Sequence, residues 1–290
     1  MDTAEYNSAF LALTISSGAT HKYLSSLAQG KSVVHLHNAD IQSVSAKFPT
    51  KREQEKIHLL FGKIDTLITL HQRKYEKLVN IKKSMLDKMF PQNGASVPEI
   101  RFKGFTDPWE QRKLKELYFQ LTERNADLLP YQKTLSVATM SFKTDGNGAA
   151  DTSLANYKRL RTGDIAFEGH TSKEFRYGRF VLNDVGDGIM SPRFSALRPL
   201  HEMPINFWKY YIHYEPIMRK VLVNSTKAGT MMNELVINEF LQESILVPSV
   251  AEQQAIGRFF KQLDTLITLH QRKLEKLQNI KKSCLEKMFV

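Results

Sequence analysis

Cysteine is nearly absent from this sequence, and so are long hydrophobic runs. Cys284 is the only cysteine among 290 residues, so neither an intramolecular disulfide nor a multi-cysteine zinc site can form, and a reducing cytoplasm is the expected location. The apolar stretch from Ala9 to Ile15 is far shorter than the roughly 20 residues of a membrane helix, and no basic region precedes it. We therefore expect neither a membrane span nor a signal peptide.

Acidic residues are few relative to basic ones. The 41 lysines and arginines outnumber the 30 aspartates and glutamates, which gives a net charge of +11. A surplus of this size favours a polyanionic partner, with nucleic acid ahead of a membrane surface. Nine of the eleven surplus charges lie in residues 51–90 and 250–290, notably at Lys82, Lys83, Lys281 and Lys282. These lysines form either a solvated helix face or a surface for phosphate or a partner.

Patterns typical of nucleic-acid enzymes are missing. No two prolines are adjacent, which excludes the Pro-Pro motif of DNA amino-methyltransferases, and no acidic residue has lysine two positions later, which excludes the common metal-binding motif of restriction nucleases. No Gly-x-x-x-x-Gly-Lys loop is present, and residues 145–148 are predicted to form a plain turn. His35, His37 and Asp40 are interpreted as a solvated strand. We predict no catalytic residue, no metal site and no cofactor bound by this chain.

A long internal repeat organises the sequence. The segment DTLITLHQRK at residues 65–74 recurs unchanged at residues 264–273, and 24 of 34 positions are identical between residues 57–90 and 256–289 at a constant offset of 199. The similarity extends upstream, where Pro49, Glu53 and Gln54 match residues 248, 252 and 253. About 140 residues precede the second copy, but only residues 1–48 precede the first.

Each copy has the apolar spacing of a long helix without proline. Two such helices are expected to pair as a coiled coil, with Leu60, Leu67 and Ile81 on a row adjoining the first seam and Phe259, Leu266 and Ile280 on the row adjoining the second. The predicted seam positions recur every seven residues: Ile57, Ile64, His71, Leu78 and Met85 in the first copy, and Ile256, Leu263, His270, Leu277 and Cys284 in the second.

Three seam residues have side chains that could bind a metal or a proton or react as a thiol. His71 and His270 occupy the same position in both copies, so they form either a metal or proton-linked site or, as we favour, a polar contact within the coiled coil. Cys284 replaces Met85 on the same stripe and is interpreted as a buried apolar thiol rather than a reactive one.

The region between the helices has a mixed pattern. Strands are expected at residues 134–142, 164–167, 178–183 and 194–198, and helices at residues 206–213 and 215–223 with a break at Pro216. This indicates one α+β domain. The breaker-rich residues 91–98 are expected to end the first helix as a linker. Phe102, Phe105 and Trp109 follow, and we expect them to fix the start of the domain to its core rather than to stack on bases.

Two motifs carry a family resemblance: the PxxxEQ motif with the DTLITLHQRKLEKLQNIKKSCLEKMF helix, and PEIRFKGFTDPWEQRKL at the start of the middle domain. With these the sequence resembles the specificity subunit of type I restriction-modification systems over essentially its whole length. The resemblance implies an α+β fold with one globular target-recognition domain plus two long helices forming an antiparallel coiled coil. It implies these segments: 1–48, the tail of a truncated first target-recognition domain; 49–90, the central conserved helical region; 91–109, a linker and lead-in; 110–248, the target-recognition domain; and 249–290, the distal conserved helix.

The same resemblance implies a function and partners. The chain would be a noncatalytic, sequence-specific DNA-binding subunit that directs a type I adenine methyltransferase and restriction complex to its target, and its short first recognition domain leaves open a half-subunit that forms a homodimer. Its partners would be double-stranded DNA, methylation subunits and restriction subunits, with S-adenosylmethionine, ATP and Mg bound in those partner subunits. The alternative is a scaffold or a silent or recombining cassette that binds the methylation subunit without productive DNA recognition. An enzyme with an unfamiliar active site is a third possibility.

Candidate DNA contacts are loop residues with cationic, hydroxyl or aromatic side chains. Arginine can bind guanine through two hydrogen bonds and threonine can contact the thymine methyl, whereas lysine at positions 143 and 158 is expected to contact phosphate. A solvated hairpin is the alternative for residues 169–179. The predicted set is Lys143, Lys158, Thr171, Ser172, Lys173, Arg176, Tyr177, Arg179, Arg193, Lys227 and Thr230.

Overall fold

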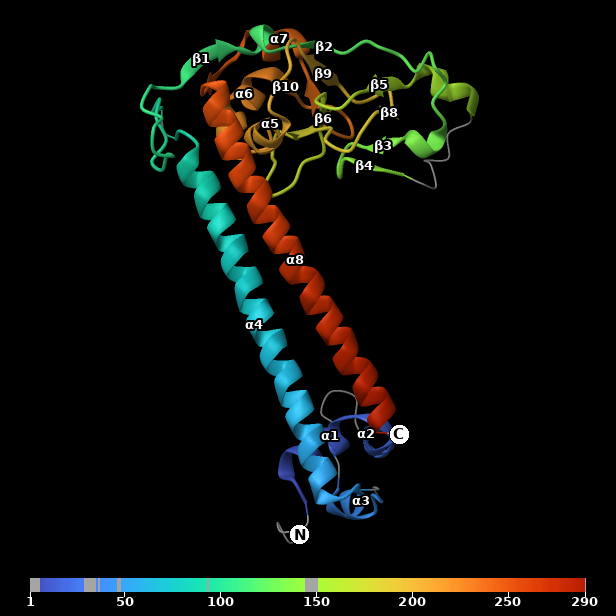
Figure 1. Ribbon diagram of the computed structural model, residues 1–290. Coiled ribbons are helices and arrows are strands. Elements are labelled where there is room, and N and C mark those ends of the chain that lie inside the picture. Colours follow the sequence, from blue (N-terminus) through green and yellow to red (C-terminus); the bar gives the residue numbers. More distant parts are fainter. Residues whose placement is uncertain are drawn as a thin grey trace. The chain divides into compact units, whose positions relative to one another are not determined.

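The chain forms two compact units joined through its long helices. The computed structural model describes residues 6–28, 35, 37–45, 48–92, 94–143 and 151–289, without the side chains of residues 151 and 152. Unit 1 comprises Met1–Asn80 and Thr265–Val290, and unit 2 comprises Ile81–Asp264. The boundaries fall inside α4 (Lys51–Met89) and α8 (Val250–Met288) (Figure 1). The turn predicted at residues 145–148 lies outside the described residues.

The repeated segments form the two long helices. Each has 39 residues, which corresponds to about 58 Å at 1.5 Å per residue. Pro49 and Pro248 precede them and Pro91 follows α4, so the proline-free stretches set their extents. Among the described residues, no helix is both long and apolar enough to span a membrane.

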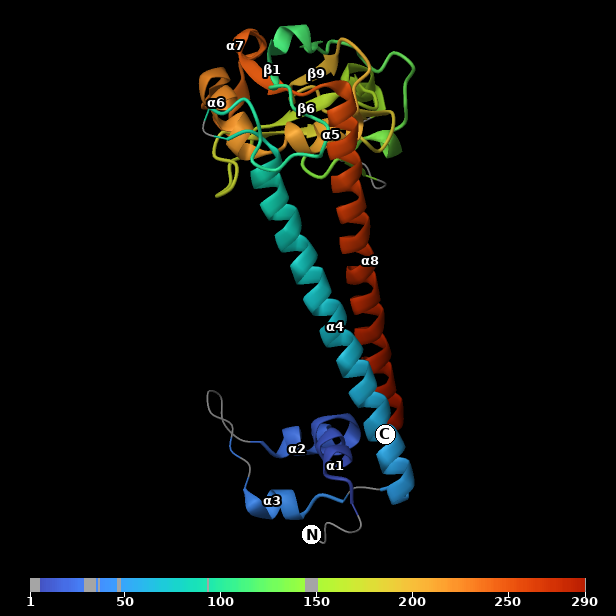
Figure 2. The same ribbon diagram turned by 60° about the vertical axis from the view of Figure 1, so that its left-hand side comes forward.

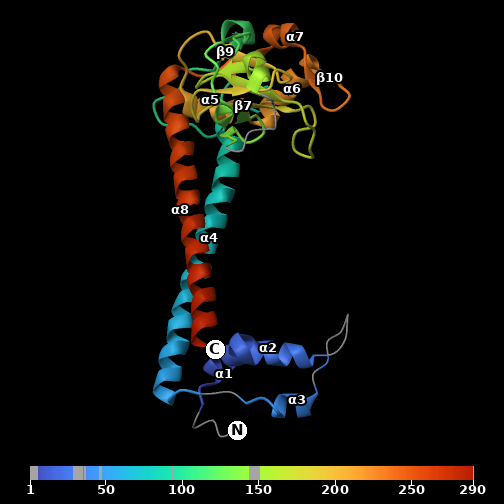
Figure 3. The ribbon, with the colours of Figure 1, turned by 90° about the vertical axis from the view of Figure 1, so that its right-hand side faces the viewer.

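Within unit 1 the two helices run antiparallel. Lys281 Nζ lies 2.6 Å from Asp65 Oδ1, and His270 Nδ1 lies 2.9 Å from His71 Nδ1. Residue numbers therefore rise along α4 as they fall along α8, as Figure 3 shows for these parts of the helices. The expected antiparallel pairing is confirmed.

The row predicted beside the seam is only partly right, because Ile81 and Phe259 are half-buried but its other four members are exposed. Leu60, Leu67, Leu266 and Ile280 are 40–43% exposed. The second row that is buried or half-buried lies one residue after the predicted one. Its members follow the first-row residues by four positions and precede the next first-row residues by three. This row contains Phe61, Ile68 and Tyr75 on α4, and Phe260, Ile267 and Leu274 on α8. All predicted seam residues are buried or half-buried: Ile57, Ile64, His71, Leu78, Met85, Ile256, Leu263, His270, Leu277 and Cys284.

Two seam lysines make ion pairs between the helices. Lys281 binds Asp65 in unit 1, and Lys82 Nζ lies 2.6 Å from Asp264 Oδ1 in unit 2. The two pairs are equivalent under the offset of 199 residues. Tyr210 also donates a hydrogen bond to Asp264 Oδ2, at 2.5 Å. These two lysines are therefore committed to helix pairing, whereas the neighbouring Lys83 and Lys282 are exposed.

Short helices complete unit 1: α1 (Ser8–Ser16), α2 (Gly18–Leu27) and α3 (Asn38–Gln42) (Figure 2). Phe10 of α1 packs with Ile57, Phe61 and Phe289, and Cys284 contacts this cluster. Of the expected strand at residues 35–40, the described positions show only an isolated β-bridge at His35, because His37 caps α3 and Asp40 lies in that helix.

The helices of unit 1 match those that end the sheet domain of unit 2. At the offset of 199 residues, α1, α2 and α3 overlap α5 (Ile205–Tyr211), α6 (Glu215–Ser225) and α7 (Ile237–Gln242). The repeat therefore extends beyond the long helices into the segments before them.

Unit 2 contains an antiparallel four-stranded sheet in the order β2-β9-β6-β7. Leu121, Leu160, Ala166, Met190 and Ala196 are buried together beside it, and α5 and α6 pack against β7. The sheet strands are β2 (Tyr118–Gln120), β9 (Ala196–Pro199), β6 (Ile165–Glu168) and β7 (Arg179–Leu182).

Smaller elements surround this sheet. Antiparallel two-stranded ladders join β1 to β12, β3 to β4, β5 to β8 and β10 to β11. Their bounds are β1 (Glu110–Lys113), β3 (Leu135–Ser136), β4 (Ser141–Phe142), β5 (Lys158–Leu160), β8 (Gly188–Met190), β10 (Thr226–Lys227), β11 (Glu234–Leu235) and β12 (Ser244–Val247), with 3₁₀ helices η1 (Leu114–Glu116), η2 (Tyr131–Lys133) and η3 (Asp151–Asn156).

Most predicted elements of unit 2 are confirmed. The expected strands near residues 164–167, 178–183 and 194–198 correspond to β6, β7 and β9, and Pro216 lies in the first turn of α6. The single strand expected at residues 134–142 was wrong: β3 and β4 form a hairpin there, because Met140 adopts a φ of +44° that reverses the chain. Trp109 is buried against Phe90, as expected for a core contact.

Candidate nucleic-acid interface

The loop between β6 and β7, together with Arg179 at the start of β7, carries six of the eleven predicted DNA contacts. Its ends are glycines that the geometry requires: a Cβ on Gly169 would lie 2.0 Å from the carbonyl oxygen of Asn233, and Gly178 has a φ of +83°. Thr171, Ser172 and Lys173 between them are exposed. The loop is thus a constrained turn with an exposed tip.

Buried contacts hold this loop on the domain. The Phe175 ring lies 5.0 Å from the His213 ring, and the Arg179 guanidinium lies 4.9 Å above Phe175. Burial lowers the pKa of His213, so this imidazole is neutral at pH 7 and packs as an aromatic ring. Arg179 also donates a hydrogen bond to the Ala138 carbonyl at 2.9 Å. Arg179 is therefore largely an anchor, whereas Arg176 is exposed.

The first turn of the loop contains a carboxylate and a histidine. Glu168, only 6% exposed, accepts hydrogen bonds from the backbone NH of His170 at 3.2 Å and contacts the His170 Nδ1 at 2.5 Å. Because Glu168 ends β6, it orients the chain as it leaves the sheet.

A second loop, between β10 and β11, is bonded to the first. The Asn233 NH donates to the Gly169 carbonyl at 2.9 Å, and the Asn233 side chain donates to the Arg176 carbonyl at 3.2 Å. Lys227 and Thr230 on this loop are exposed, and Figure 3 shows both loops projecting from the same side of unit 2. The structure therefore joins candidates more than 50 residues apart into one surface, which we call the two-loop surface (residues 169–179 and 226–235).

The other candidates occupy a separate part of unit 2. Lys143 and Arg193 are exposed at the ends of β4 and β8. Lys158 on β5 donates to the Phe194 carbonyl at 2.6 Å, and burial together with the charge of Arg124 lowers its pKa. The Lys158 ammonium keeps two further N–H groups beyond this internal hydrogen bond, and for all three residues DNA contact stays a prediction.

An ion-pair network fixes the start of β6. The Arg198 guanidinium binds Asp164 at 2.8 Å and Glu123 at 2.5 Å, and Arg161 binds Glu123 at 2.7 Å. Hydrogen bonds from Arg161 and Arg198 hold the pKa of Glu123 at about 2, below its usual 4.5, whereas burial raises the pKa of Asp164. This network braces the strand that leads into the two-loop surface.

Glu123→Gln should reduce the stability of unit 2 at neutral pH. A depressed carboxylate pKa contributes stability above about pH 4.5, and this contribution is lost as the pH falls towards 2. Because the Glu123 side chain is 32% exposed, we expect a loss of about 1–2 kcal/mol at pH 7 and a flatter stability profile between pH 4.5 and 2. Urea unfolding of both proteins across this range measures it. An unchanged profile would contradict the assignment.

A family comparison decides what this domain is. Residues 107–279 match the family described as the type I restriction modification DNA specificity domain. The chain belongs to the type I restriction-modification DNA specificity family. This confirms the resemblance read from the sequence, and the matched residues include the whole two-loop surface and most of α8.

Individual members of the specificity family are distant in sequence. The MjaVIII type I restriction enzyme specificity subunit of Methanocaldococcus jannaschii is 22% identical over 283 residues, covering 90% of this chain and 64% of that protein. The HsdS subunit of Thermoanaerobacter tengcongensis superposes with a TM-score of 0.54 at 17% identity, covering 99% of this chain and 70% of that one. The S subunit from M. genitalium gives 0.59 at 14% identity, with 100% and 74% covered. These structures share the fold, and the chain spans just under two thirds of the curated relative.

Some residues of the two-loop surface carry no signal in the sequence. Asn233 connects the loops through its main chain and side chain, and Met231 is 76% exposed beside Thr230. An isolated asparagine or methionine in a loop is unremarkable in sequence. The sequence signal for the first loop was the pair Gly169 and Gly178, which lie on either side of a basic segment.

Proposed function

We propose that this chain recognises a DNA sequence through the two-loop surface and directs the methylation and restriction subunits of a type I system to it. Family membership across residues 107–279 is the observation that carries the proposal. The exposed cations of the surface, Lys173, Arg176 and Lys227, supply the chemistry for phosphate and base contacts. Restriction and methylation chemistry, with S-adenosylmethionine, ATP and Mg, would belong to the partner subunits.

A methylation map tests this function. DNA is sequenced for modified adenine from cells that express the chain with a cognate methylation subunit and no other specificity subunit. One recurring motif is the expected result, and a two-fold symmetric bipartite motif would indicate that two copies of the chain act together. No motif above background, with both proteins soluble, would contradict the proposal and favour a scaffold or silent cassette.

Arg176→Ala should relax specificity. If Arg176 binds a guanine edge, its loss costs about 1–3 kcal/mol of discrimination at one base position. The measurement compares dissociation constants for the mapped motif and for single-base variants. Arg112→Ala, on an exposed arginine of β1 outside both loops, is the control. Equal effects of the two substitutions would remove Arg176 from base recognition.

Lys143→Ala should weaken DNA binding without changing specificity. A phosphate contact contributes equally to all sequences, so its loss should lower the slope of log affinity against log salt concentration by about one. Lys115→Ala, on another exposed lysine of unit 2, is the matched control. An unchanged salt slope for the Lys143 variant would show that this side chain does not contact phosphate.

A further inference from the structure

Glu168 is a buried carboxylate at the edge of the two-loop surface. It ends β6, and its side chain is only 7% exposed. A carboxylate at this depth needs hydrogen bonds or an opposite charge to compensate for the water it has lost. Among the described residues, no lysine or arginine forms an ion pair with it, and its antiparallel partner Arg179 binds the Ala138 carbonyl. The compensation therefore comes from another side chain.

His170 provides this compensation. Its backbone NH donates to Glu168 Oε1 at 3.2 Å, and its Nδ1 lies 2.5 Å from the same oxygen. An ionised carboxylate only accepts hydrogen bonds, so the proton of this contact is on Nδ1. The contact thereby fixes the orientation of the ring and commits one of its two nitrogens to Glu168.

The main chain that precedes His170 is fixed as well. A Cβ on Gly169 would lie 2.0 Å from the Asn233 carbonyl oxygen, and the Gly169 carbonyl accepts the Asn233 NH at 2.9 Å. The imidazole therefore extends from a backbone position that both loops of the surface define. Its side chain is nevertheless 60% exposed, and no group in the described part of the chain bonds to its Nε2.

An exposed imidazole with a fixed orientation suits base recognition. Phosphate can be bound by a mobile lysine such as the neighbouring Lys173, whereas a base edge requires a donor or acceptor at a defined position. A histidine that served only to solvate the surface would need no partner. Burial of the Glu168 carboxylate beside His170 costs folding free energy, and a ring held ready for a base would explain why it is there.

We propose that His170 forms a hydrogen bond with a base edge of the target DNA through Nε2, and that Glu168 is the residue that positions it. His170 would touch the DNA, whereas Glu168 acts through the imidazole ring. The contacts predicted from the sequence begin at Thr171 and do not include this histidine. The proposal rests on DNA recognition by the two-loop surface and adds to it a residue that selects between bases.

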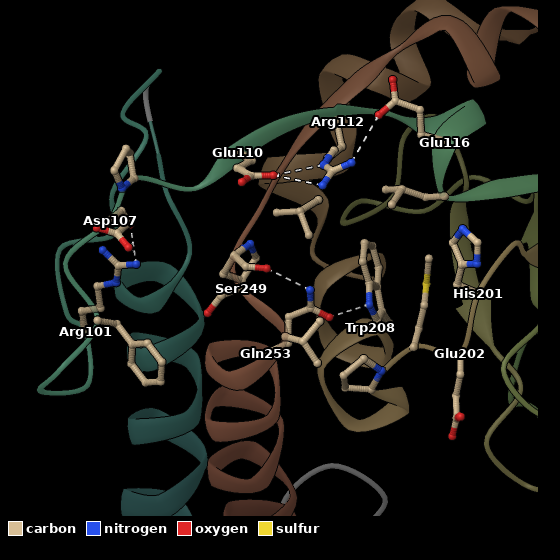
Figure 4. Close-up of a pocket in the computed structure, with 18 of the residues that line it drawn as sticks. Arg101, Asp107, Glu110, Arg112, Glu116, His201, Glu202, Trp208, Ser249 and Gln253 are labelled. Atoms are coloured by element: carbon tan, nitrogen blue, oxygen red, sulfur yellow. Dashed lines mark hydrogen bonds and ion pairs between the residues drawn. The ribbon is translucent and has the colours of Figure 1, made fainter.

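The probes are a duplex that carries the motif from the methylation map and duplexes in which one base pair of that motif is changed. His170→Asn keeps an amide that can bond to Glu168 but has no atom at the position of Nε2. We expect this variant to bind the motif about tenfold more weakly and to lose discrimination at one base position. His201→Asn is the matched control and should leave binding unchanged, because this exposed histidine of unit 2 lines a hollow outside both loops (Figure 4).

Glu168→Gln tests the positioning role. This variant keeps an acceptor oxygen but loses the charge that holds the Nδ1 proton, so we expect a smaller loss of discrimination at the same base position. The double variant should lose no more than His170→Asn alone, because the two residues act through one contact. Tryptophan fluorescence during urea unfolding shows whether each variant is folded under the binding conditions, and His170→Asn alone decides the base contact if Glu168→Gln is not.

Three results would overturn the proposal. The first is a His170→Asn variant that discriminates between the motif and its altered forms as the wild type does. The second is a loss of affinity that is equal for every duplex, which would indicate a phosphate contact. The third is additive losses in the double variant, which would show that Glu168 does not act through His170. Each of these leaves the proposed function standing, whereas a methylation map without a motif would overturn both.

Discussion

Arg101→Ala should lower the free energy of unfolding of unit 2 by about 3–5 kcal/mol. The substitution leaves the Glu252 carboxylate, 1% exposed, without its partner, and an uncompensated buried charge is among the most destabilising single changes. Both tryptophans of the chain, Trp109 and Trp208, are buried in unit 2. Their fluorescence during urea unfolding therefore reports this unit selectively.

Two further variants make the Arg101 result interpretable. Replacing Arg101 and Glu252 together by methionine removes both charges, and most of the stability should return. Glu99→Gln disrupts the surface pair with Lys88, whose side chains are 67% and 40% exposed, and should cost less than about 1 kcal/mol. If Arg101→Ala cost no more than Glu99→Gln, the buried pair would not stabilise the domain.

Gly257→Ala should destabilise unit 2 by about 1–3 kcal/mol, although alanine favours helix formation. A Cβ at this position of α8 would lie 2.7 Å from the Phe207 nitrogen and 2.9 Å from the Asn206 carbonyl carbon. Both are backbone atoms at the start of α5, so relief requires the helices to separate. Tryptophan fluorescence again follows the change, since Trp208 lies on α5.

Gly62→Ala provides the matched comparison. Gly62 is also a glycine within a long helix, but a Cβ added there would have no described atom within 4 Å beyond its own helix backbone and chain neighbours. Its replacement should raise the stability of unit 1 by up to about 1 kcal/mol through helix propensity alone. Circular dichroism at 222 nm measures it. Effects of the same sign for both glycines would show that close contact between α5 and α8 is not what constrains Gly257.

The sequence repeat was sufficient to predict the long helices and their pairing, and the residues of the predicted first row are buried or half-buried. A repeat of seven residues identifies the first row of the seam. The second row lies either three or four residues after each residue of the first, and the repeat alone does not decide between the two. That ambiguity explains why the spacing favoured Leu60 and Leu67 for the second row instead of Phe61 and Ile68. A buried phenylalanine repeated at positions 61 and 260 was the signal that could have resolved it.

The two-loop surface could be predicted only in part. Its first loop was recognisable from glycines around a cluster of basic and hydroxyl residues. The link from Asn233 to Gly169 joins segments more than 60 residues apart through one main-chain hydrogen bond, and no local pattern encodes such a contact. The division of Arg176 and Arg179 into an exposed and an anchoring arginine likewise depends on the distant Ala138 carbonyl.

Anchors and exposed residues are different positions in the two-loop surface. Gly169, Phe175 and Gly178 hold the first loop in place, whereas Thr171, Ser172, Lys173 and Arg176 are exposed. The Ser172 hydroxyl caps the Phe175 NH, and the Arg176 guanidinium lies 5.8 Å from the Tyr177 ring. The exposed positions can therefore vary in charge, size and hydrogen-bonding groups at little cost in folding free energy. A lineage could diversify what this surface selects while inheriting one unaltered scaffold.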